Sequence, residues 1–296
     1  MEIRALKLDS GDPADVAVIH LARGANPPAA LEHFLKSYQL HPAGFQHQLI
    51  VAFKGYDDPQ SLQRHIDLAL AVGATPLLLD KDDGFDLAAY RRSAELLQHE
   101  YIVCVNSFSE ILIDGWLGLL LRALLMPGMG LVGATGSWES ISSTTFRGLL
   151  VHPNRTQRWN PSVLARGVKE YFVFPRFPNV HVRSNGFAIR RLDFLGIQWP
   201  DDLEHKESLH ALESGCSGVT RQIQAKGLKV AVVGADGKIY PPSEWSQSRT
   251  FRSGNQENLL LADNRTRDFS KGDPEIRNWL SLTTWNTPDT PSKDRS

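Results

Sequence analysis

The most promising chemical groups of this sequence lie in a polar turn, residues 106–110, that directly follows an apolar run. Two hydroxyls, from Ser107 and Ser109, accompany the amide of Asn106 and the carboxylate of Glu110. Hard oxygen ligands of this kind suit a divalent cation, although a single carboxylate makes a weak site. A cap on the following helix by Ser109 or Glu110 explains the same residues equally well. The sequence leaves both interpretations open.

Charged side chains follow other apolar runs in the first half of the chain. Arg23 and Lys54 each come at the end of such a run, Asp82 and Asp83 lie in an acidic loop, and Arg91 lies on the helix expected after that loop. Carboxylates can accept hydrogen bonds from a base or ribose, and the cations can offset phosphate charge. An ordinary turn is the alternative interpretation of the two aspartates. No glycine-rich dinucleotide or phosphate-loop motif occurs, which disfavours dehydrogenases and ATPases of those types.

The second half offers an aromatic side chain and a polar pair in unusual settings. Trp138 follows an apolar run within a Gly/Ser loop, where it could form a ligand wall by stacking on a sugar or base. Arg183 and Asn185 interrupt an otherwise apolar strand, and buried polar groups need partners. A phosphate or sugar hydroxyl would serve as that partner, and so would an internal hydrogen-bond network.

Two further candidates are a carboxylate and a pair of arginines. Glu213 lies at an expected junction between helices, where it could cap a helix or act as a general base. Arg249 and Arg252 could clamp a pyrophosphate, and a solvated basic loop explains them equally well.

The elements that would position these residues alternate along the chain. Apolar runs predict strands at residues 16–21, 48–53, 75–79, 101–105 and 130–132. Helical spacing predicts helices at residues 28–38, 59–72, 87–98, with Asp86 as the N-cap, and 116–125. This alternation indicates an α/β fold with a mostly parallel sheet covered by helices on both faces. Ligands of such sheets bind at the carboxyl edge, where the candidate loops would lie.

The pattern is less regular in the second half. Residues 141–178 show no clear periodicity, which is typical of a segment that covers a cleft or of a surface insertion. A strand at 180–189, a helix at 203–212, a break at 213–215, a helix at 219–226 and a strand at 228–233 then follow.

Composition excludes several classes of protein. The 296 residues carry a formal net charge of -1, which gives no reason to expect a nucleic-acid partner. The longest apolar stretch is well short of the about 20 residues of a membrane span, and the N-terminus does not resemble a signal peptide. We therefore expect a cytoplasmic protein without an integral membrane segment. Cys104 and Cys216 predict neither a disulfide framework nor a zinc site.

The order of these motifs resembles that of the GT-A-type glycosyltransferases, close to family 2, over roughly residues 14 to 235. Residues 101–110 take the place of the family's Asp-x-Asp strand and motif, and the segment Leu212-Glu213-Ser214 resembles its acidic base motif. The resemblance implies one Rossmann-like domain at 1–285. Residues 14–140 would form a nucleotide-sugar half and residues 141–270 an acceptor half with a closing segment, before a disordered tail at 286–296.

The same resemblance implies inverting transfer of a sugar from a nucleotide-sugar donor to a hydroxyl of a glycan or glycolipid acceptor. Glu213 would be the base, Trp138, Arg183 and Asn185 would bind the acceptor, and Glu110 would hold a metal. The remaining candidates would bind the donor: Arg23, Lys54, Asp82, Asp83, Arg91, Asn106, Ser107, Ser109, Arg249 and Arg252. Because Ser107-Phe108-Ser109 replaces Asp-x-Asp, dependence on Mg²⁺ or Mn²⁺ stays open.

The implied setting is bacterial surface glycan synthesis, in the cytoplasm or peripherally at the inner membrane. A non-catalytic relative that binds a nucleotide-sugar or glycan is the first alternative, and a nucleotidyltransferase is the second.

Overall fold

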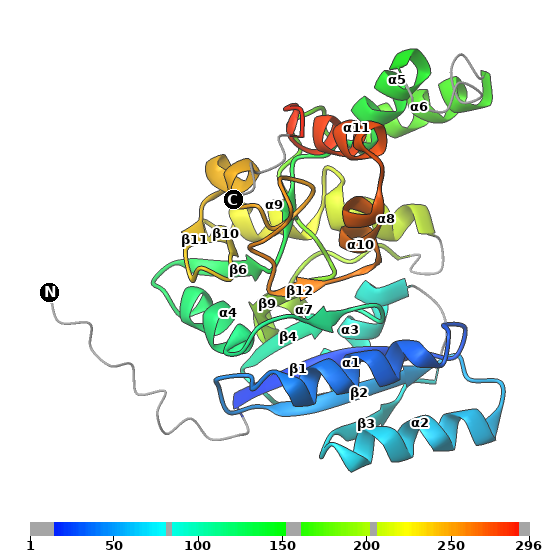
Figure 1. The fold of residues 1–296 in the computed structure, drawn as a ribbon, viewed down its shortest axis with the longest axis vertical. Helices are drawn as coiled ribbons and strands as arrows, with labels where there is room; N and C mark the ends of the chain where they lie inside the picture. Colours follow the sequence, from blue (N-terminus) through cyan, green and yellow to red (C-terminus); the bar gives the residue numbers. More distant parts are fainter. Residues whose placement is uncertain (1–14, 81–84, 152–160, 202–205, 290–296) are drawn as a thin grey trace, which may run out of the picture.

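The central element of the structure, a computed structural model that describes residues 15–80, 85–151, 161–201 and 206–289, is an eight-stranded sheet. Its order is β11-β10-β6-β9-β4-β1-β2-β3 (Figure 1). The strands are β1 Val16–Arg23, β2 Gln48–Lys54, β3 Thr75–Leu78, β4 Tyr101–Val105, β6 Met129–Gly133, β9 Gly186–Arg190, β10 Lys229–Val233 and β11 Ile239–Tyr240. Only β9 and β11 pair antiparallel with their neighbours in this sheet. The expected mostly parallel sheet is confirmed.

Helices cover both faces of the sheet because successive strand residues point to opposite sides. Val16 and Val18 of β1 pack into the cluster with α1 Ala29–Leu40, α2 Pro59–Ala71 and α4 Trp116–Leu124. Ala17 and Ile19 pack into the other cluster, with α3 Phe85–Leu96, α7 Arg191–Leu195, α8 Lys206–Ser214 and α9 Val219–Ala225. The result is a layered α/β domain with an apolar core on each side of the sheet.

Short elements bring later segments of the chain to the carboxyl edge of this sheet. β5 Glu110–Ile111 pairs with β12 Leu261–Ala262, and β7 Gly136–Ser137 pairs with β8 His181–Val182. A 3-10 helix, Pro242–Gln247, precedes β12, and α10 Asn264–Lys271 and α11 Pro274–Trp285 follow it. The loop after β4 thereby meets a segment more than a hundred residues further along the chain, and the loop after β6 meets the segment that precedes β9.

The boundaries differ from the sequence-based expectation at several points. Asp86 lies in the first turn of α3 rather than at its N-cap. The segment without periodicity contains two helices, α5 Ile141–Val151 and α6 Pro161–Val173, which pack against each other away from the sheet (Figure 1). The expected strand at 180–189 is interrupted at residues 183–185. Asp82, Asp83 and residues 203–205 lie outside the described residues.

The prediction of a break between helices at 213–215 was wrong for Glu213 and Ser214, because α8 continues through Ser214. Gly215 ends the helix: its N–H donates to the Ala211 carbonyl at 2.7 Å, and an added Cβ would lie only 2.4 Å from that oxygen. Glu213 therefore sits on the last turn of a helix, which fixes its direction more firmly than a loop would.

The end of the described chain is tied to the domain. Asn286 takes a left-handed conformation that ends α11, and Asp289 pairs with Arg277 at 2.9 Å. The rest of the expected tail, residues 290–296, lies outside the described residues. None of the helices in the described ranges combines the length and apolar character needed to cross a bilayer.

Candidate active site

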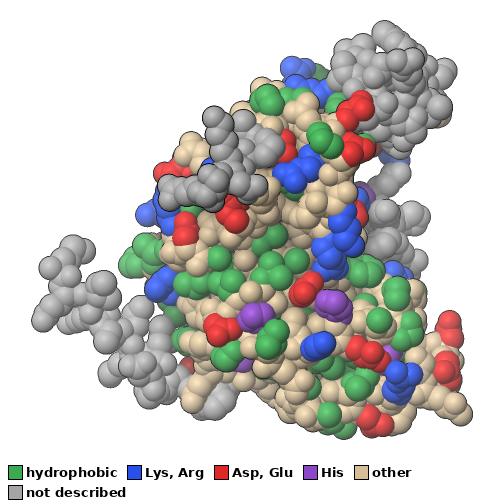
Figure 2. Space-filling view, viewed as in Figure 1, with side chains coloured by type: hydrophobic (Ala, Val, Ile, Leu, Met, Phe, Trp, Pro, Cys, Tyr) green, Lys and Arg blue, Asp and Glu red, His purple; other side chains and the backbone are tan. Residues whose placement is uncertain are grey.

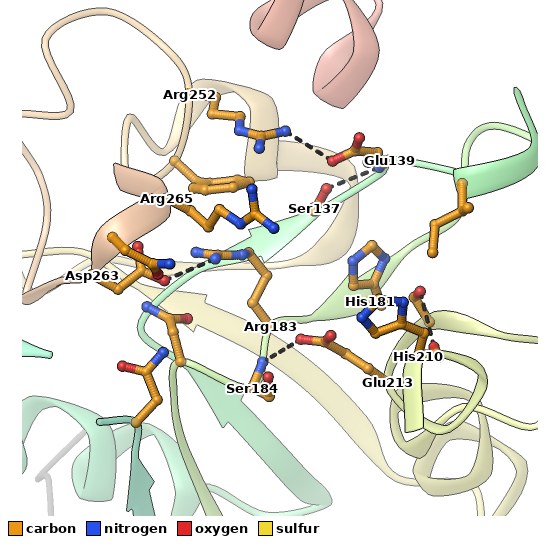
Figure 3. Close-up of a pocket in the computed structure, with 16 residues that line it drawn as sticks. Ser137, Glu139, His181, Arg183, Ser184, His210, Glu213, Arg252, Asp263 and Arg265 are labelled. Carbon is orange, nitrogen blue, oxygen red and sulfur yellow. Dashed lines mark hydrogen bonds and ion pairs between the residues drawn. The ribbon is translucent and has the colours of Figure 1, made fainter. Parts of the chain in front are cut away.

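A cavity of about 340 Å³ opens at the carboxyl edge of the sheet (Figure 3). Its walls come from the loops after β4 and β7, the segment from β8 to β9, the end of α8, the loop before β12 and the start of α10. Charged and polar side chains dominate this lining: Asn106, Ser137, Glu139, His181, Arg183, Ser184, Asn185, His210, Glu213, Arg252, Asp263 and Arg265. Such a lining suits a small polar ligand.

A buried ion pair between Arg183 and Asp263 forms one wall. The Arg183 guanidinium donates to an Asp263 carboxylate oxygen at 2.8 Å and lies 3.9 Å from the centre of the Phe251 ring. Asp263 also caps α10, because it accepts the Thr266 N–H at 2.8 Å. Burial would raise the pKa of Asp263, but Arg183 and Thr266 outweigh burial and hold it below its usual value. One carboxylate thus joins the start of α10 to the segment before β9.

A second ion pair joins Arg252 to Glu139 at 2.8 Å. Arg252 is buried, donates also to the Thr284 hydroxyl of α11 at 3.2 Å, and has a left-handed backbone with φ of 46°. Its N–H bonds the Gln256 side chain at 3.0 Å, which holds this costly conformation in place. Burial, then the nearby charges of Arg183 and Arg265, lower the pKa of Arg252 despite the opposing effect of Glu139.

Glu213 lies on the wall across from these arginines (Figure 3). One carboxylate oxygen accepts the Ser184 N–H at 2.7 Å. Burial would raise the pKa of Glu213, but His181, the hydrogen bonds from Ser184 and the charge of Arg183 hold it below the usual range. Glu213 is therefore ionised at neutral pH and can accept a proton.

The fully buried Asn179 fixes the end of α8 on which Glu213 lies. Its side-chain N–H donates to the Ser214 carbonyl at 2.6 Å. Its own carbonyl accepts a hydrogen bond from Nδ1 of His181 at 2.8 Å. Burial is the main effect that lowers the pKa of His181, so the ring is neutral at pH 7 and its Nε2 is an acceptor.

A smaller cavity of about 160 Å³ shares Ser184, His210 and Glu213 with the first and adds Asp86. Asp86 is half-buried at the start of α3. Burial raises its pKa to about 6, with Glu213 adding to the rise and the charges of Lys54 and Arg23 opposing it. Arg23, Lys54, Asp86 and Glu213 therefore influence one another at the strand edge.

The turn at 106–110 is held by hydrogen bonds within the protein. The Asn106 side-chain oxygen accepts from the Phe108 N–H at 3.1 Å and the Ser109 hydroxyl at 2.7 Å. Glu110 contacts His33 and Arg267, each at 3.4 Å, and does not line the cavity. No group of three His, Cys, Asp or Glu side chains within the described ranges could hold a metal. The described residues of this turn do not fit a metal site.

The structure brings some of the predicted residues together and separates others. Asn106, Arg183, Asn185, Glu213 and Arg252 line the main cavity. Ser107 and Arg23 line a narrow pocket beside β1, and Lys54 is buried at the end of β2.

The other predicted residues lie elsewhere. Arg91 pairs with Glu95 and stacks over Trp199, Arg249 is exposed and pairs with Glu257, and Trp138 packs edge-on against Trp285. Ser109 is buried within the turn at 106–110.

Several cavity residues were not predicted from the sequence. Glu139 is the neighbour of Trp138, Asp263 and Arg265 follow β12, and His210 lies one turn before Glu213. The signal for His210 was present, because residues three apart on a helix share a face. No local pattern distinguishes Glu139 or Asp263 from ordinary surface carboxylates.

Comparisons with known proteins gave matches only at the level of structure. The sequence matches no protein-family model and no curated protein. One similar solved structure is glucosyl-3-phosphoglycerate synthase from Mycobacterium tuberculosis, at 18% identity and a TM-score of 0.41, covering 67% of this chain and 64% of that one. Another is a mannosyltransferase from Pyrobaculum calidifontis, at 15% identity and a TM-score of 0.47, covering 80% of this chain and 61% of that one.

A third is CMP:2-keto-3-deoxy-manno-octonic acid synthetase, at 16% identity and a TM-score of 0.42, covering 74% of this chain and 88% of that one. The chain spans less than two thirds of the length of the first two. At these values the likeness carries no argument about chemistry.

Proposed function

We propose that this chain is a glycosyltransferase that moves a sugar from a nucleotide-sugar to an acceptor hydroxyl with inversion. The observation that supports it most is the ionised Glu213 in a cavity at the carboxyl edge of the sheet, with the cations Arg23 and Lys54 at the neighbouring strand ends. A sugar transfer requires both features, because a hydroxyl must lose a proton while a diphosphate gains negative charge.

The residues divide the reaction between them. Glu213 accepts the proton of the acceptor hydroxyl. At the same time, the oxygen of that hydroxyl bonds to the anomeric carbon, and the bond between the anomeric carbon and the diphosphate oxygen breaks. The nucleoside diphosphate leaves from the opposite face of the sugar, which inverts the configuration. The Ser184 N–H orients the Glu213 carboxylate for this step, with Asn179 holding the helix end behind it.

The donor would lie over the ends of β1, β2 and β4. Arg23 and Lys54 would offset its diphosphate charge, and Asn106 and Ser107, which follow β4, would contact it. The donor roles of Asp82, Asp83, Arg91, Ser109 and Arg249, and the acceptor role of Trp138, stay predictions. A place in bacterial surface glycan synthesis and a cytoplasmic or peripheral location rest on the sequence resemblance alone.

The test compares Glu213→Gln with the native protein. A thermal-shift screen of nucleotide-sugars, with and without Mn²⁺, first identifies the donor, because a ligand that binds the folded state raises its Tm. Glutamine can still accept the Ser184 N–H, so the donor-induced shift should persist. Transfer should fall by about 10²- to 10⁴-fold, the usual contribution of a general base.

The control is Glu244→Gln, which removes a carboxylate paired with Lys238 outside the cavity. It should retain native transfer. Full activity of Glu213→Gln would refute the assignment of the base.

A further inference from the structure

Three hydrogen-bond donor groups around the main cavity have no acceptor among the residues that the structure describes. Asn185 is 2% exposed, its side-chain oxygen accepts the Thr135 hydroxyl at 2.6 Å, and its Nδ2 has no partner. The Nε of the buried Arg252 has none either. Arg265 lines the cavity without a hydrogen bond or ion pair to any residue of the described ranges. Buried donors such as those of Asn185 and Arg252 are costly without acceptors, so their presence at a cavity indicates a ligand that supplies oxygen atoms. The exposed Arg265 lines the same cavity.

The charges of the cavity are separated along its length. Arg183 and Arg252 are each paired with a carboxylate, Asp263 and Glu139. Among the described residues that line the cavity, this leaves Arg265 as the cation without a carboxylate partner and Glu213 as an ionised carboxylate. The two lie on opposite walls, with Arg183 between them (Figure 3). A molecule with an anionic group at one end and a hydroxyl at the other matches this arrangement.

The position of Arg265 separates it from two of the expected donor residues, Arg23 and Lys54. It belongs to α10, which follows β12, whereas Arg23 and Lys54 end β1 and β2. Figure 2 shows Lys and Arg side chains grouped where Figure 1 places α10, a helix that carries Arg265, Arg267 and Lys271. The cavity of about 340 Å³ is at the small end of ligand sites, about 300–1,000 Å³, so the ligand is a small molecule.

We propose that the acceptor of this transferase is a small hydroxyl compound bearing a phosphate or carboxylate, which Arg265, Arg252 and Asn185 bind while Glu213 receives its hydroxyl. This proposal rests on the proposed function and specifies its acceptor. Anchoring the anion at one end of the cavity selects which hydroxyl reaches Glu213, so the same contact provides affinity and regiochemistry.

The experiment measures binding of three matched probes by isothermal titration calorimetry. Glucose 6-phosphate, glucuronate and glucose share a ring and differ in the anionic group. We expect at least one charged probe to bind ten-fold or more tightly than glucose, and the two charged arms to distinguish a phosphate site from a carboxylate site. Arg265→Gln should lower the affinity for that probe by about 10- to 100-fold, which is the effect of losing a hydrogen bond to a charged group.

The matched control is Lys271→Gln, which removes the same charge from the same helix at its exposed far end. It should bind the probe as the native protein does. Equal binding of all three probes, no binding of either charged probe at 10 mM, or equal effects of the two substitutions would overturn the proposal.

A competition arm separates this proposal from the proposed function. If the anion site belongs to the donor, saturating nucleoside diphosphate displaces the charged probe, and the acceptor assignment is wrong while the transferase can stand. If the probe binds as expected but no nucleotide-sugar is consumed, the transferase assignment is wrong while the anion site stands.

Discussion

Replacing Asp263 by Asn tests the ion pair that joins α10 to the cavity. Asp263 is 1% exposed and accepts hydrogen bonds from both Arg183 and the Thr266 N–H, each at 2.8 Å. Asparagine caps helices about as well as aspartate, so Asp263→Asn keeps the cap and removes the charge. The substitution therefore isolates the pair with Arg183 from the start of the helix.

The expected cost follows from the surroundings of Arg183. Its side chain is 12% exposed, so loss of its partner leaves a largely buried cation. Breaking a fully buried pair costs about 3–5 kcal/mol, and a hydrogen bond to a charged group contributes about 1.5–3 kcal/mol. Stacking on Phe251 and some contact with water remain, so we expect the free energy of unfolding to fall by about 2–4 kcal/mol.

Urea denaturation followed by tryptophan fluorescence measures this change. The matched control is Asp273→Asn: Asp273 caps α11 through the Ile276 N–H at 2.9 Å but is exposed. Its replacement should cost less than about 0.5 kcal/mol, as for most surface changes. Equal costs for the two variants would show that the ion pair does not hold α10.

The pH dependence provides a second check on the same pair. The folded-state pKa of Asp263 is lowered, so its contribution is present above its ordinary pKa of 3.8 and is lost as pH falls through the folded value. The stability difference between native protein and Asp263→Asn should therefore shrink below about pH 4. A difference that stays constant to pH 2 would contradict this reasoning.

Two further predictions concern the smaller cavity and the support of the base. The pKa of Asp86 is raised from 3.8 to about 6, so Asp86→Asn should increase the free energy of unfolding at pH 8, by at most about 3 kcal/mol. That gain should vanish well below pH 4, where the carboxyl group is protonated in both the folded and the unfolded state. Urea denaturation of the native protein and the variant at pH 8 and at the acidic pH measures the difference. Asn179→Ala should lower kcat about ten-fold with little change in KM, because Glu213 loses its fixed helix end while substrate contacts remain. Transfer kinetics check this, and a KM that rises with kcat unchanged would instead place Asn179 in binding.

The first half of the fold could be predicted because its signals are local. β4 begins and ends at the predicted residues, and each of its last four residues is buried, as the unbroken apolar run indicated. α2 begins where Asp58 caps it and Pro59 occupies its first turn. Such features depend on a few neighbouring side chains, so one sequence suffices to recognise them.

The second half resisted prediction because its structure depends on distant contacts. The polar residues 183–185 turn the chain so that β9 enters the sheet antiparallel between β4 and β6. No periodicity in that segment predicts the antiparallel direction of β9, because pairing with β4 and β6 determines it. Helices α5 and α6 likewise pack on each other rather than on the sheet, a contact that only the folded chain shows.

The same distinction explains the candidate site. Arg183, Asn185 and Glu213 were recognisable because each is polar within an apolar or helical segment. Their partners were not, since Asp263 is 80 residues from Arg183, and Glu139 is 113 residues from Arg252. A carboxylate becomes part of a site only when folding places a cation beside it.

The placement of carboxylates also decides which arginine remains available to a ligand. Arg249, Arg252 and Arg265 lie within one short stretch of the sequence, and only the first two were predicted to bind a ligand. In the structure Glu257 pairs with the first at the surface and Glu139 with the second inside the cavity. Arg265, on α10, lines the cavity and has no carboxylate partner among the described residues. Because paired cations attract an anion only weakly, Arg265 dominates recognition at its end of the cavity. The distance from Arg265 to Glu213 then limits the length of the acceptor. The arrangement of the ion pairs, rather than the number of arginines, therefore determines which acceptor fits.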